Sequence, residues 1–162
     1  MIELKKITIL DDNMKECIAL DIVSDKKGHM WSNAITLAIA HRRFKRFSTA
    51  MECRAIYAQG KMVGLAAYCH CVEPPTFIET CYRIRPIMVD KNHQGKGYEE
   101  AALRKLLEEI RTKPHGETTA IFATYLPKEE DMAKVYEATG FTKTDMKCAN
   151  PRDEDIIVRM TL

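Results

Sequence analysis

The sequence predicts one α/β domain built on a mostly antiparallel sheet with about four helices. Its 162 residues suffice for a single domain whose core needs no disulfide or metal staple. Segments with the two-residue apolar period of strands are mixed along the chain with segments that have a helical period. Because no internal repeat or Pro/Gly/Ser-rich linker divides the chain, we expect residues 1–162 to form one domain.

The N-terminal part predicts a strand followed by two helices. Residues 2–10 have the pattern of a strand, and Asn13 with Glu16 has the spacing of a helix-capping box. A first helix then buries the apolar residues Met14, Cys17, Ile18 and Ile22. A second helix runs from about Ser32 into the basic segment 41–46. That segment could hold an acidic ligand or RNA, but its interleaved phenylalanines favour a helix with a solvated charged face.

The middle of the chain predicts a hairpin and a further strand. Residues 54–68 form two strand-like runs joined at Gln59-Gly60, where glycine tolerates the positive φ of a tight turn. Residues 80–89 form another strand, with Pro86 inside it. Because proline cannot donate a hydrogen bond to a sheet, we expect an edge or a bulge at this point.

The C-terminal part predicts two helices and three strands. A helix over residues 98–111 has apolar residues along one face, and residues 118–126 form a strand. A short helix over residues 129–139 ends at Gly140, which is placed as a C-terminal cap. Two last strands over residues 141–148 and 155–162 flank a turn at Asn150-Pro151.

The composition is that of a soluble globular protein. Lys and Arg number 25 against 23 Asp and Glu, and 46% of the residues are hydrophobic. The net charge of +2 implies no obligatory polyanionic partner. The longest nearly apolar stretch, Ala34–Ala40, is far below the roughly 18 residues of a membrane span. Since the first residues carry no apolar signal region, we expect a cytoplasmic protein without membrane or nucleic-acid partners.

The six cysteines are expected to be reduced and mostly buried. They are too few for a secreted disulfide scaffold, and none of them forms a C-x-x-C pair. Cys69, His70 and Cys71 form one cluster. On a strand, however, the two thiols point to one face and the imidazole to the other, so we expect no metal site.

The loop between residues 90 and 97 is the most informative segment. It follows a strand, contains Gly95 and Gly97, and opens a helix, which is the arrangement of a phosphate-binding loop. Two other glycine motifs do not fit. Lys96 is followed by glycine, which excludes a P-loop, and Glu100 stands where a dinucleotide fingerprint has its third glycine.

With these residues the sequence resembles the GNAT superfamily of N-acetyltransferases, whose loop Q/R-x-x-G-x-G/A binds the pyrophosphate of acetyl-CoA. Residues 94–98, Gln-Gly-Lys-Gly-Tyr, match its first five positions, and Glu99 replaces the last small residue. Tyr136 to Phe141 is similar to a second family motif, Y-x-x-x-G-F. The family also has a bulge where Pro86 stands, which splays the sheet at its centre and opens a cleft for pantetheine.

The resemblance implies a role for each matching residue. The backbone of the strand before the loop would pair with pantetheine and polarise the thioester carbonyl, and the loop would hold the pyrophosphate. Tyr136 would be the general acid for the leaving thiolate, although a core tyrosine and a plain glycine turn remain the alternatives. The expected acetyl-CoA-binding residues are Ile87, Met88, Val89, Gln94, Gly95, Lys96, Gly97, Tyr98, Glu99 and Glu100.

The acceptor is expected to be a primary amine of a small molecule. Within the superfamily the pattern is nearest to bacterial spermidine/spermine-type enzymes. Arg85 stands where these commonly have an acidic residue, and Arg83 shares its strand face, so both are expected at the acceptor. Glu79 and His70 are the candidate bases.

Two features of the expected function stay open. One alternative to an enzyme is a degenerate domain that binds CoA or a partner without catalysis, because Glu99 and Arg85 depart from the family pattern. The other concerns assembly, since an exposed edge strand is compatible with a homodimer.

Overall fold

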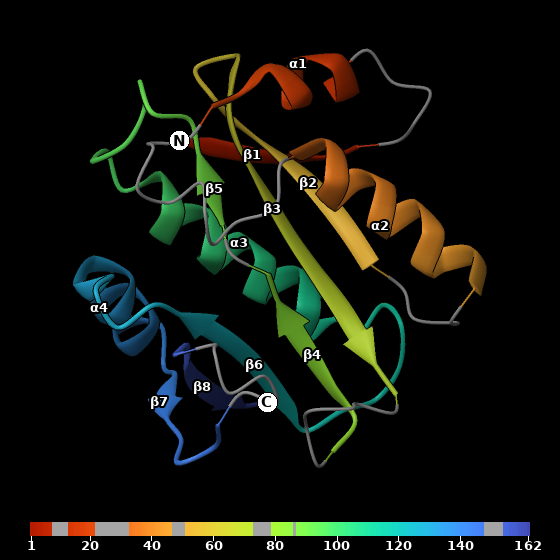
Figure 1. Cartoon of the computed structure of the whole chain (residues 1–162), viewed down its shortest axis with the longest axis vertical. Coiled ribbons are helices and arrows are strands. Elements are labelled where there is room, and N and C mark those ends of the chain that lie inside the picture. Colours follow the sequence, from red (N-terminus) through yellow and green to blue (C-terminus); the bar gives the residue numbers. More distant parts are fainter. Residues whose placement is uncertain (8–12, 22–32, 47–50, 73–78, 86, 148–153) are drawn as a thin grey trace.

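The computed structural model describes residues 1–7, 13–21, 33–46, 51–72, 79–85, 87–147 and 154–162 (Figure 1). Its elements follow the predicted order, with four helices and eight strands in this part of the chain. They are β1 (Ile2–Lys6), α1 (Asn13–Ala19), α2 (Asn33–Arg46), β2 (Met51–Ala58), β3 (Lys61–Cys71), β4 (Cys81–Ile84), β5 (Met88–Val89), α3 (Tyr98–Arg111), β6 (Ala120–Tyr125), α4 (Glu130–Ala138), β7 (Thr142–Lys143) and β8 (Ile156–Thr161).

One sheet contains all of these strands. Its order is β1-β2-β3-β4-β6-β8-β7, and β5 pairs with β3 beyond the end of β4. Every pairing is antiparallel except that of β4 with β6, which is parallel. The predicted mixed, mostly antiparallel α/β fold is therefore confirmed, and β1 and β7 are its edge strands.

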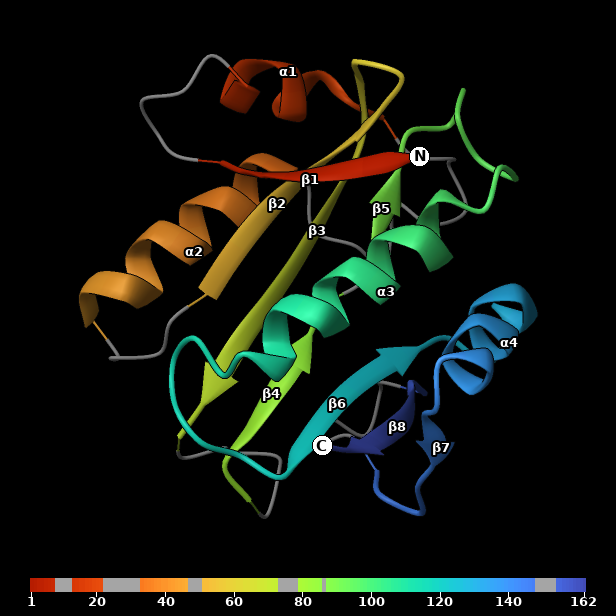
Figure 2. The same cartoon turned by 180° about the vertical axis from the view of Figure 1, so that it is seen from behind.

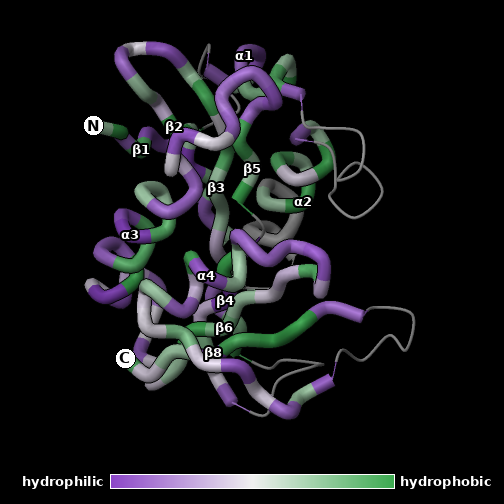
Figure 3. Tube along the Cα trace, turned by 90° about the vertical axis from the view of Figure 1, so that its left-hand side faces the viewer, coloured by the Kyte–Doolittle hydropathy of each residue, from purple (hydrophilic) through white to green (hydrophobic). Residues whose placement is uncertain are grey.

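Helices cover both faces of the sheet, so most of its strands are buried on both sides. One core cluster joins α3 and α4 to one face, and a second joins α1 and α2 to the other face. Seen from behind, α3 lies across the strands (Figure 2). In Figure 3, β5 and β6 are coloured as largely hydrophobic, whereas α3 alternates between polar and hydrophobic residues. This pattern fits strands covered on both faces and a helix with one face on the sheet.

The β2–β3 hairpin forms as predicted. Gln59 and Gly60 have φ values of 51° and 77°, so both turn residues are left-handed, as a tight hairpin requires. Further along β3, Gly64 pairs with Val89 on β5. A Cβ atom at Gly64 would collide with the Met88 carbonyl oxygen, so this close approach of two strands requires glycine.

Three predicted strands are shorter or more broken than expected. The strand predicted over 80–89 forms two pieces, β4 and β5, and the one over 141–148 is only β7. The hydroxyl of Thr144 bonds to the Met146 N–H and to the Ile157 carbonyl, so a local turn replaces further sheet pairing. The first strand ends at Lys6, and the predicted residues 8–10, Ile22, Ser32, Pro86, Cys148 and the Asn150-Pro151 turn lie outside the described residues.

Candidate active site

The sheet opens between β5 and β6, and a bulge causes the opening. Ile84 on β4 pairs with Tyr68, and Met88 on β5 pairs with Leu65. The four residue steps from Ile84 to Met88 therefore lie opposite only three residue steps on β3. Because the Arg85 N–H still donates to the Ala67 carbonyl, the register against β3 changes by one residue between Arg85 and Met88. β4 pairs with β6 only at Tyr82 and Arg83, whereas β5 pairs only with β3 in the described part of the chain.

The backbone of Ile87 and Val89 faces this opening. In an antiparallel pair, alternate residues direct their N–H and C=O groups toward the partner strand. The Asp90 N–H donates to the Val63 carbonyl over 2.8 Å, so the backbone groups of Met88 and Asp90 face β3. Those of Ile87 and Val89 consequently point away from β3, where a ligand between β5 and β6 would meet the backbone of Ile87 and the N–H of Val89, since the Val89 carbonyl accepts a hydrogen bond from Gln94.

The glycine loop leads from this strand into the N-terminus of α3. Gly95 and Gly97 have φ values of 72° and 71°, which favour glycine, and a Cβ atom at either would meet open space. Gly97 is the N-cap of α3, and no side chain caps this terminus. Free N–H groups at the start of a 14-residue helix, beside open space, suit a phosphate. Glu99 lies in the same first turn and opposes a bound anion.

A buried carboxylate, which the sequence analysis did not single out, shapes the beginning of this loop. Asp90 is only 7% exposed and accepts hydrogen bonds from the N–H groups of Asp21 and Asn92, at 2.9 and 3.0 Å. Burial acts to raise the pKa of Asp90, but these hydrogen bonds outweigh it and hold the pKa below its usual value. The side chain of Gln94 donates to the Val89 carbonyl over 3.2 Å, which folds the loop back onto the strand.

Tyr136 lies on α4 in the same core cluster as Val89 and Tyr98. It is 1% exposed, and its ring packs on those of Tyr125 and Phe141, with centroid distances of 6.0 and 5.2 Å. Burial, and then the charge of Glu129, raise the pKa of Tyr136 above its usual value. The phenol is therefore protonated at neutral pH, as a general acid must be.

The end of α4 explains why the Tyr136 and Phe141 positions occur together. Gly140 has a φ of 96°, which ends the helix in the left-handed conformation, as predicted from the sequence. The Phe141 N–H then donates to the Tyr136 carbonyl over 3.0 Å. This turn brings the Phe141 ring edge-on against Tyr136 and fixes the ring of the candidate acid.

A cavity of about 730 Å³ lies beside Tyr136, between α4 and the strands β7 and β8. The rings of Tyr125, Tyr136 and Phe141 line it together with apolar residues of β8. Lys134 and Glu137 on α4 and Lys143 on β7 supply charges of both signs to its lining. Its size is that of a small-molecule site.

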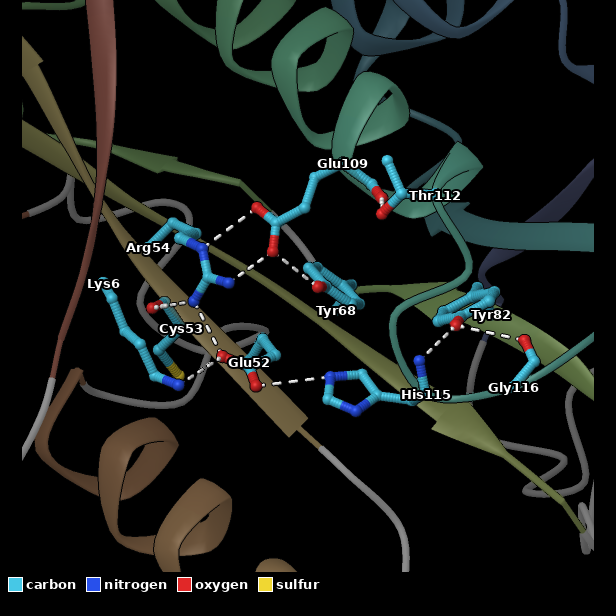
Figure 4. Close-up of polar contacts among 10 residues, drawn as sticks. All are labelled: Lys6, Glu52, Cys53, Arg54, Tyr68, Tyr82, Glu109, Thr112, His115 and Gly116. Atoms are coloured by element: carbon cyan, nitrogen blue, oxygen red, sulfur yellow. Dashed lines mark hydrogen bonds and ion pairs between the residues drawn. The ribbon is translucent and has the colours of Figure 1, made fainter.

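A polar network fixes the other end of α3 (Figure 4). Arg54 on β2 donates from Nε to Glu109 on α3 over 3.0 Å, and a second, shorter contact joins the two side chains. The Tyr68 hydroxyl donates to the same carboxylate over 2.6 Å. Arg54 also bonds to Glu52, which lies 3.2 Å from His115 Nε2. The sheet thus holds the helix that carries the glycine loop.

The structure does not bring the two candidate bases to the opening. Glu79 precedes β4, at the paired end of the sheet, where it forms an ion pair with Arg159 at 3.1 Å. Leu65 on β3 pairs with Met88 at the opening, and His70 lies five residues further along β3. The distance along the strand from Leu65 to His70 is about 17 Å. Its ring packs on Tyr82 at 4.8 Å, its buried Nε2 atom has no hydrogen-bond partner in the described part of the chain, and burial lowers its pKa.

Arg83 and Arg85 lie where β4 meets the opening. Arg83 pairs with Cys69, whose side chain belongs to the core between the sheet and helices α1 and α2, so Arg83 shares that face. The Arg85 N–H donates to the Ala67 carbonyl over 2.8 Å and continues the same register, which places both arginines on one face. The charges therefore lie on the face opposite α3.

The comparison with known families identifies the protein. The model of the Acetyltransferase (GNAT) family matches residues 19–141, which is most of the chain. The chain belongs to this family. It is therefore an acetyltransferase that uses acetyl-CoA, and the matched residues include the glycine loop and Tyr136. Among curated protein sequences, none matches the chain.

Solved structures confirm the fold. A ribosomal-protein-alanine N-acetyltransferase from Brucella melitensis has a TM-score of 0.70 at 13% identity, covering 99% of both chains. The PaiA N-acetyltransferase from Thermoplasma acidophilum, in complex with coenzyme A, has a TM-score of 0.67 at 13% identity over 100% of this chain and 99% of that one. A GNAT family acetyltransferase from Elizabethkingia anophelis, with acetyl-CoA bound, has a TM-score of 0.62 at 13% identity over 99% and 98%.

The described residues contain neither a candidate helical membrane span nor a candidate metal site. None of their helices combines the length and the apolar character needed to cross a bilayer. Nor do these residues contain a group of three or more His, Cys, Asp or Glu side chains placed to hold a metal ion.

Proposed function

We propose that this acetyltransferase transfers the acetyl group of acetyl-CoA to a primary amine of a small molecule by direct attack in a ternary complex. The observation that carries the proposal is the opening between β5 and β6, because the backbone of Ile87 and Val89 faces it. The uncapped start of α3 follows that strand along the chain, and Tyr136 packs in the same core. These features support a thioester beside the strand and its diphosphate at the helix N-terminus.

Each group then has a chemical task. The neutral amine attacks the thioester carbonyl carbon, and a backbone N–H of Ile87 or Val89 stabilises the negative charge that develops on the carbonyl oxygen. When the C–S bond breaks, the Tyr136 hydroxyl donates its proton to the leaving sulfur. The amine loses its extra proton to a base or through water. No cysteine nucleophile takes part in this scheme.

Two observations bear on the acceptor and point in different directions. The likeness of the loop to spermidine/spermine-type enzymes supports a polyamine-like acceptor. Arg83 and Arg85 lie on one face at the opening and would repel a polycation, while attracting a carboxylate or a phosphate. Neither Glu79 nor His70 lies at the opening, so we propose that the amine proton leaves through water.

The experiment that tests the proposal is CoA release from acetyl-CoA with a panel of acceptors. The panel contains spermidine, spermine, aminoglycosides, amino acids and a peptide N-terminus, with a control that lacks acceptor. Replacing Arg83 or Arg85 by glutamate should raise kcat/KM for spermidine about tenfold relative to an anionic amine, since local charge steers the acceptor. Lys105→Glu, with the same change of charge on α3, is the matched control and should leave this ratio unchanged.

The outcomes separate the alternatives. Turnover of one small amine supports the proposal and names its class. Tight CoA binding in calorimetry without turnover of any small amine contradicts the small-molecule acceptor, and turnover of the peptide alone replaces it with a protein acceptor. If neither CoA binding nor turnover occurs, a degenerate domain without catalysis replaces the proposal.

A further inference from the structure

Three thiols lie together on the sheet away from the glycine loop and Tyr136. Cys69 and Cys71 are alternate residues of β3, so their side chains share one face, and their sulfur atoms are 3.7 Å apart. Cys81 on β4 pairs directly with Cys71 across the two strands. Cys71 therefore adjoins both other thiols, Cys69 along its own strand and Cys81 across the strand pair. All three are free thiols in this structure.

From this arrangement we propose that Cys71 and Cys81 form a reversible disulfide by exchange with a small-molecule disulfide such as oxidised glutathione. The proposal does not depend on the identity of the acetyl acceptor. Disulfides in reducing compartments are usually transient or regulatory, which suits a bond made by two thiols that are free at rest.

The geometry favours Cys81 over Cys69 as the partner of Cys71. Directly paired residues on antiparallel strands have Cα atoms about 4.5–5.5 Å apart, which lies within the range that disulfides adopt. Cys69 and Cys71 are two residues apart on one strand, or about 6.7 Å, near the upper limit of that range. In addition, the Cys69 thiol donates to the Arg83 carbonyl at 3.7 Å, which commits its hydrogen elsewhere.

The two partners differ in a way that suits two-step exchange. Cys71 is partly exposed and adjoins Val72, which is 55% exposed, whereas Cys81 is fully buried. The hydrogen bond from Cys71 holds the pKa of Cys81 below its usual value, and Arg83 acts in the same direction. A small disulfide can therefore reach Cys71 first, and a thiolate at Cys81 is available for the second step. Cys69 acts to lower the pKa of Cys71, but Cys81 and burial outweigh it and raise this pKa, so the first attack is the slower step and should speed up with pH.

The exchange balances without any further reactant. The Cys71 sulfur loses its proton and attacks one sulfur of oxidised glutathione, which releases one reduced glutathione and leaves a mixed disulfide on Cys71. The Cys81 thiolate then attacks the Cys71 sulfur and releases the second glutathione. Two protein thiols are oxidised to one disulfide, and one molecule of oxidised glutathione is reduced to two thiols.

The chain contains its own control in Cys17 and Cys53. Both are buried in the core between the sheet and helices α1 and α2. Burial raises the pKa of each to about 12, so neither forms a thiolate near neutral pH. A general oxidant effect or unfolding would involve these two thiols, whereas the proposed exchange leaves them reduced.

The test is incubation of the full chain with oxidised glutathione, followed by alkylation of free thiols and peptide mass spectrometry. We expect a protein lighter by two hydrogen atoms, a Cys71–Cys81 linked peptide, and alkylation of Cys17 and Cys53 retained. Reduced glutathione should reverse the change. Because Cys148 lies outside the described residues, the same experiment in a Cys148→Ser background shows that this thiol is not required.

Variants distinguish the other pairings. Cys69→Ser should still form the disulfide, whereas Cys81→Ala should stop at a glutathione adduct on Cys71. A Cys69–Cys71 linked peptide, a persistent glutathione adduct in the wild type, or no reaction at Cys71 would each overturn the proposal. The wild-type peptide map decides the question even if Cys81→Ala does not fold.

Discussion

The ring of Phe141 lies edge-on against the ring of Tyr136, with centroids 5.2 Å apart and planes inclined by 70°. Gly140 makes this contact by ending α4 in the left-handed conformation, so the ring of the candidate acid is held by the turn that follows its own helix. The ring of Tyr125 stacks on that of Tyr136 with a centroid distance of 6.0 Å. Because contacts with two other rings hold the Tyr136 ring, removing its hydroxyl group should leave the ring in the same position.

Tyr136→Phe should therefore lower kcat without changing the fold. We expect a loss of roughly 10²-fold or more, the usual range for removing a general acid, with the KM for acetyl-CoA little changed. Tyr125→Phe removes the hydroxyl of the neighbouring ring and should keep nearly full activity. Steady-state kinetics of CoA release measures both, and equal losses in the two variants would show that Tyr136 acts only through packing.

The same residue predicts part of the pH dependence. Because burial and then Glu129 raise the pKa of Tyr136 above its usual value near 10, the phenol stays protonated through the neutral and mildly alkaline range. Loss of the Tyr136 proton should therefore not lower kcat below about pH 9.5. Any fall in kcat below that pH should remain in Tyr136→Phe, because another group causes it. A limb near pH 8 that disappears in this variant would contradict the assignment.

Gly97→Glu should abolish CoA binding and leave the fold intact. Gly97 has a φ of 71°, and the new side chain would bring a negative charge to the helix N-terminus where the pyrophosphate is expected. The matched control is Gly60→Glu, since Gly60 has a φ of 77°, is equally open and lies in the β2–β3 turn. Both should lose about 1–3 kcal/mol from backbone strain, but only Gly97→Glu should lose CoA affinity in calorimetry.

The sequence predicted the features that depend on neighbouring residues. The Gln59-Gly60 turn, the glycine loop and the Gly140 cap all contain left-handed residues, and a glycine in the sequence marks at least one such position in each. Pro86 itself lies outside the described residues, but the register against β3 changes by one residue between Ile84 and Met88. Local chemistry was enough for these parts of the fold and the site.

Features that depend on distant pairing could not be predicted in this way. Asp90 accepts a hydrogen bond from Asp21, 69 residues away, and Arg54 meets Glu109, 55 residues away. Glu79 and His70 were plausible bases because they flank the strand in sequence, but the register places both near the paired end of the sheet. The register between paired strands, which the sequence does not reveal, decides whether a charged residue lies at the opening of the sheet or at its paired end.

Arg54→Met should destabilise the protein by about 2–4 kcal/mol, because it leaves the carboxylates of Glu52 and Glu109 without their partly buried cation. The side chain of Arg54 is only 12% exposed. Arg104→Met is the matched control, since Arg104 is 53% exposed and pairs with Glu100 along α3, so it should cost less than about 0.5 kcal/mol. Urea denaturation measures both, and equal losses would show that the network of Figure 4 adds no stability.

Asp90→Asn should destabilise the protein at neutral pH, and the loss should disappear in acid. The carboxylate of Asp90 accepts hydrogen bonds from Asp21 and Asn92, and its folded pKa lies below the usual value. A lowered pKa adds stability above the unfolded pKa near 3.9, and this stability is lost as the pH falls through the folded value. We expect the wild type to exceed Asp90→Asn by about 1–3 kcal/mol at pH 7.

The difference between the two proteins should shrink steadily below about pH 4 in urea denaturation. Asp145→Asn removes an exposed carboxylate and should show neither the loss at pH 7 nor the convergence in acid. A gap between wild type and Asp90→Asn that stays constant down to pH 3 would mean that the negative charge of Asp90 is not what stabilises the loop.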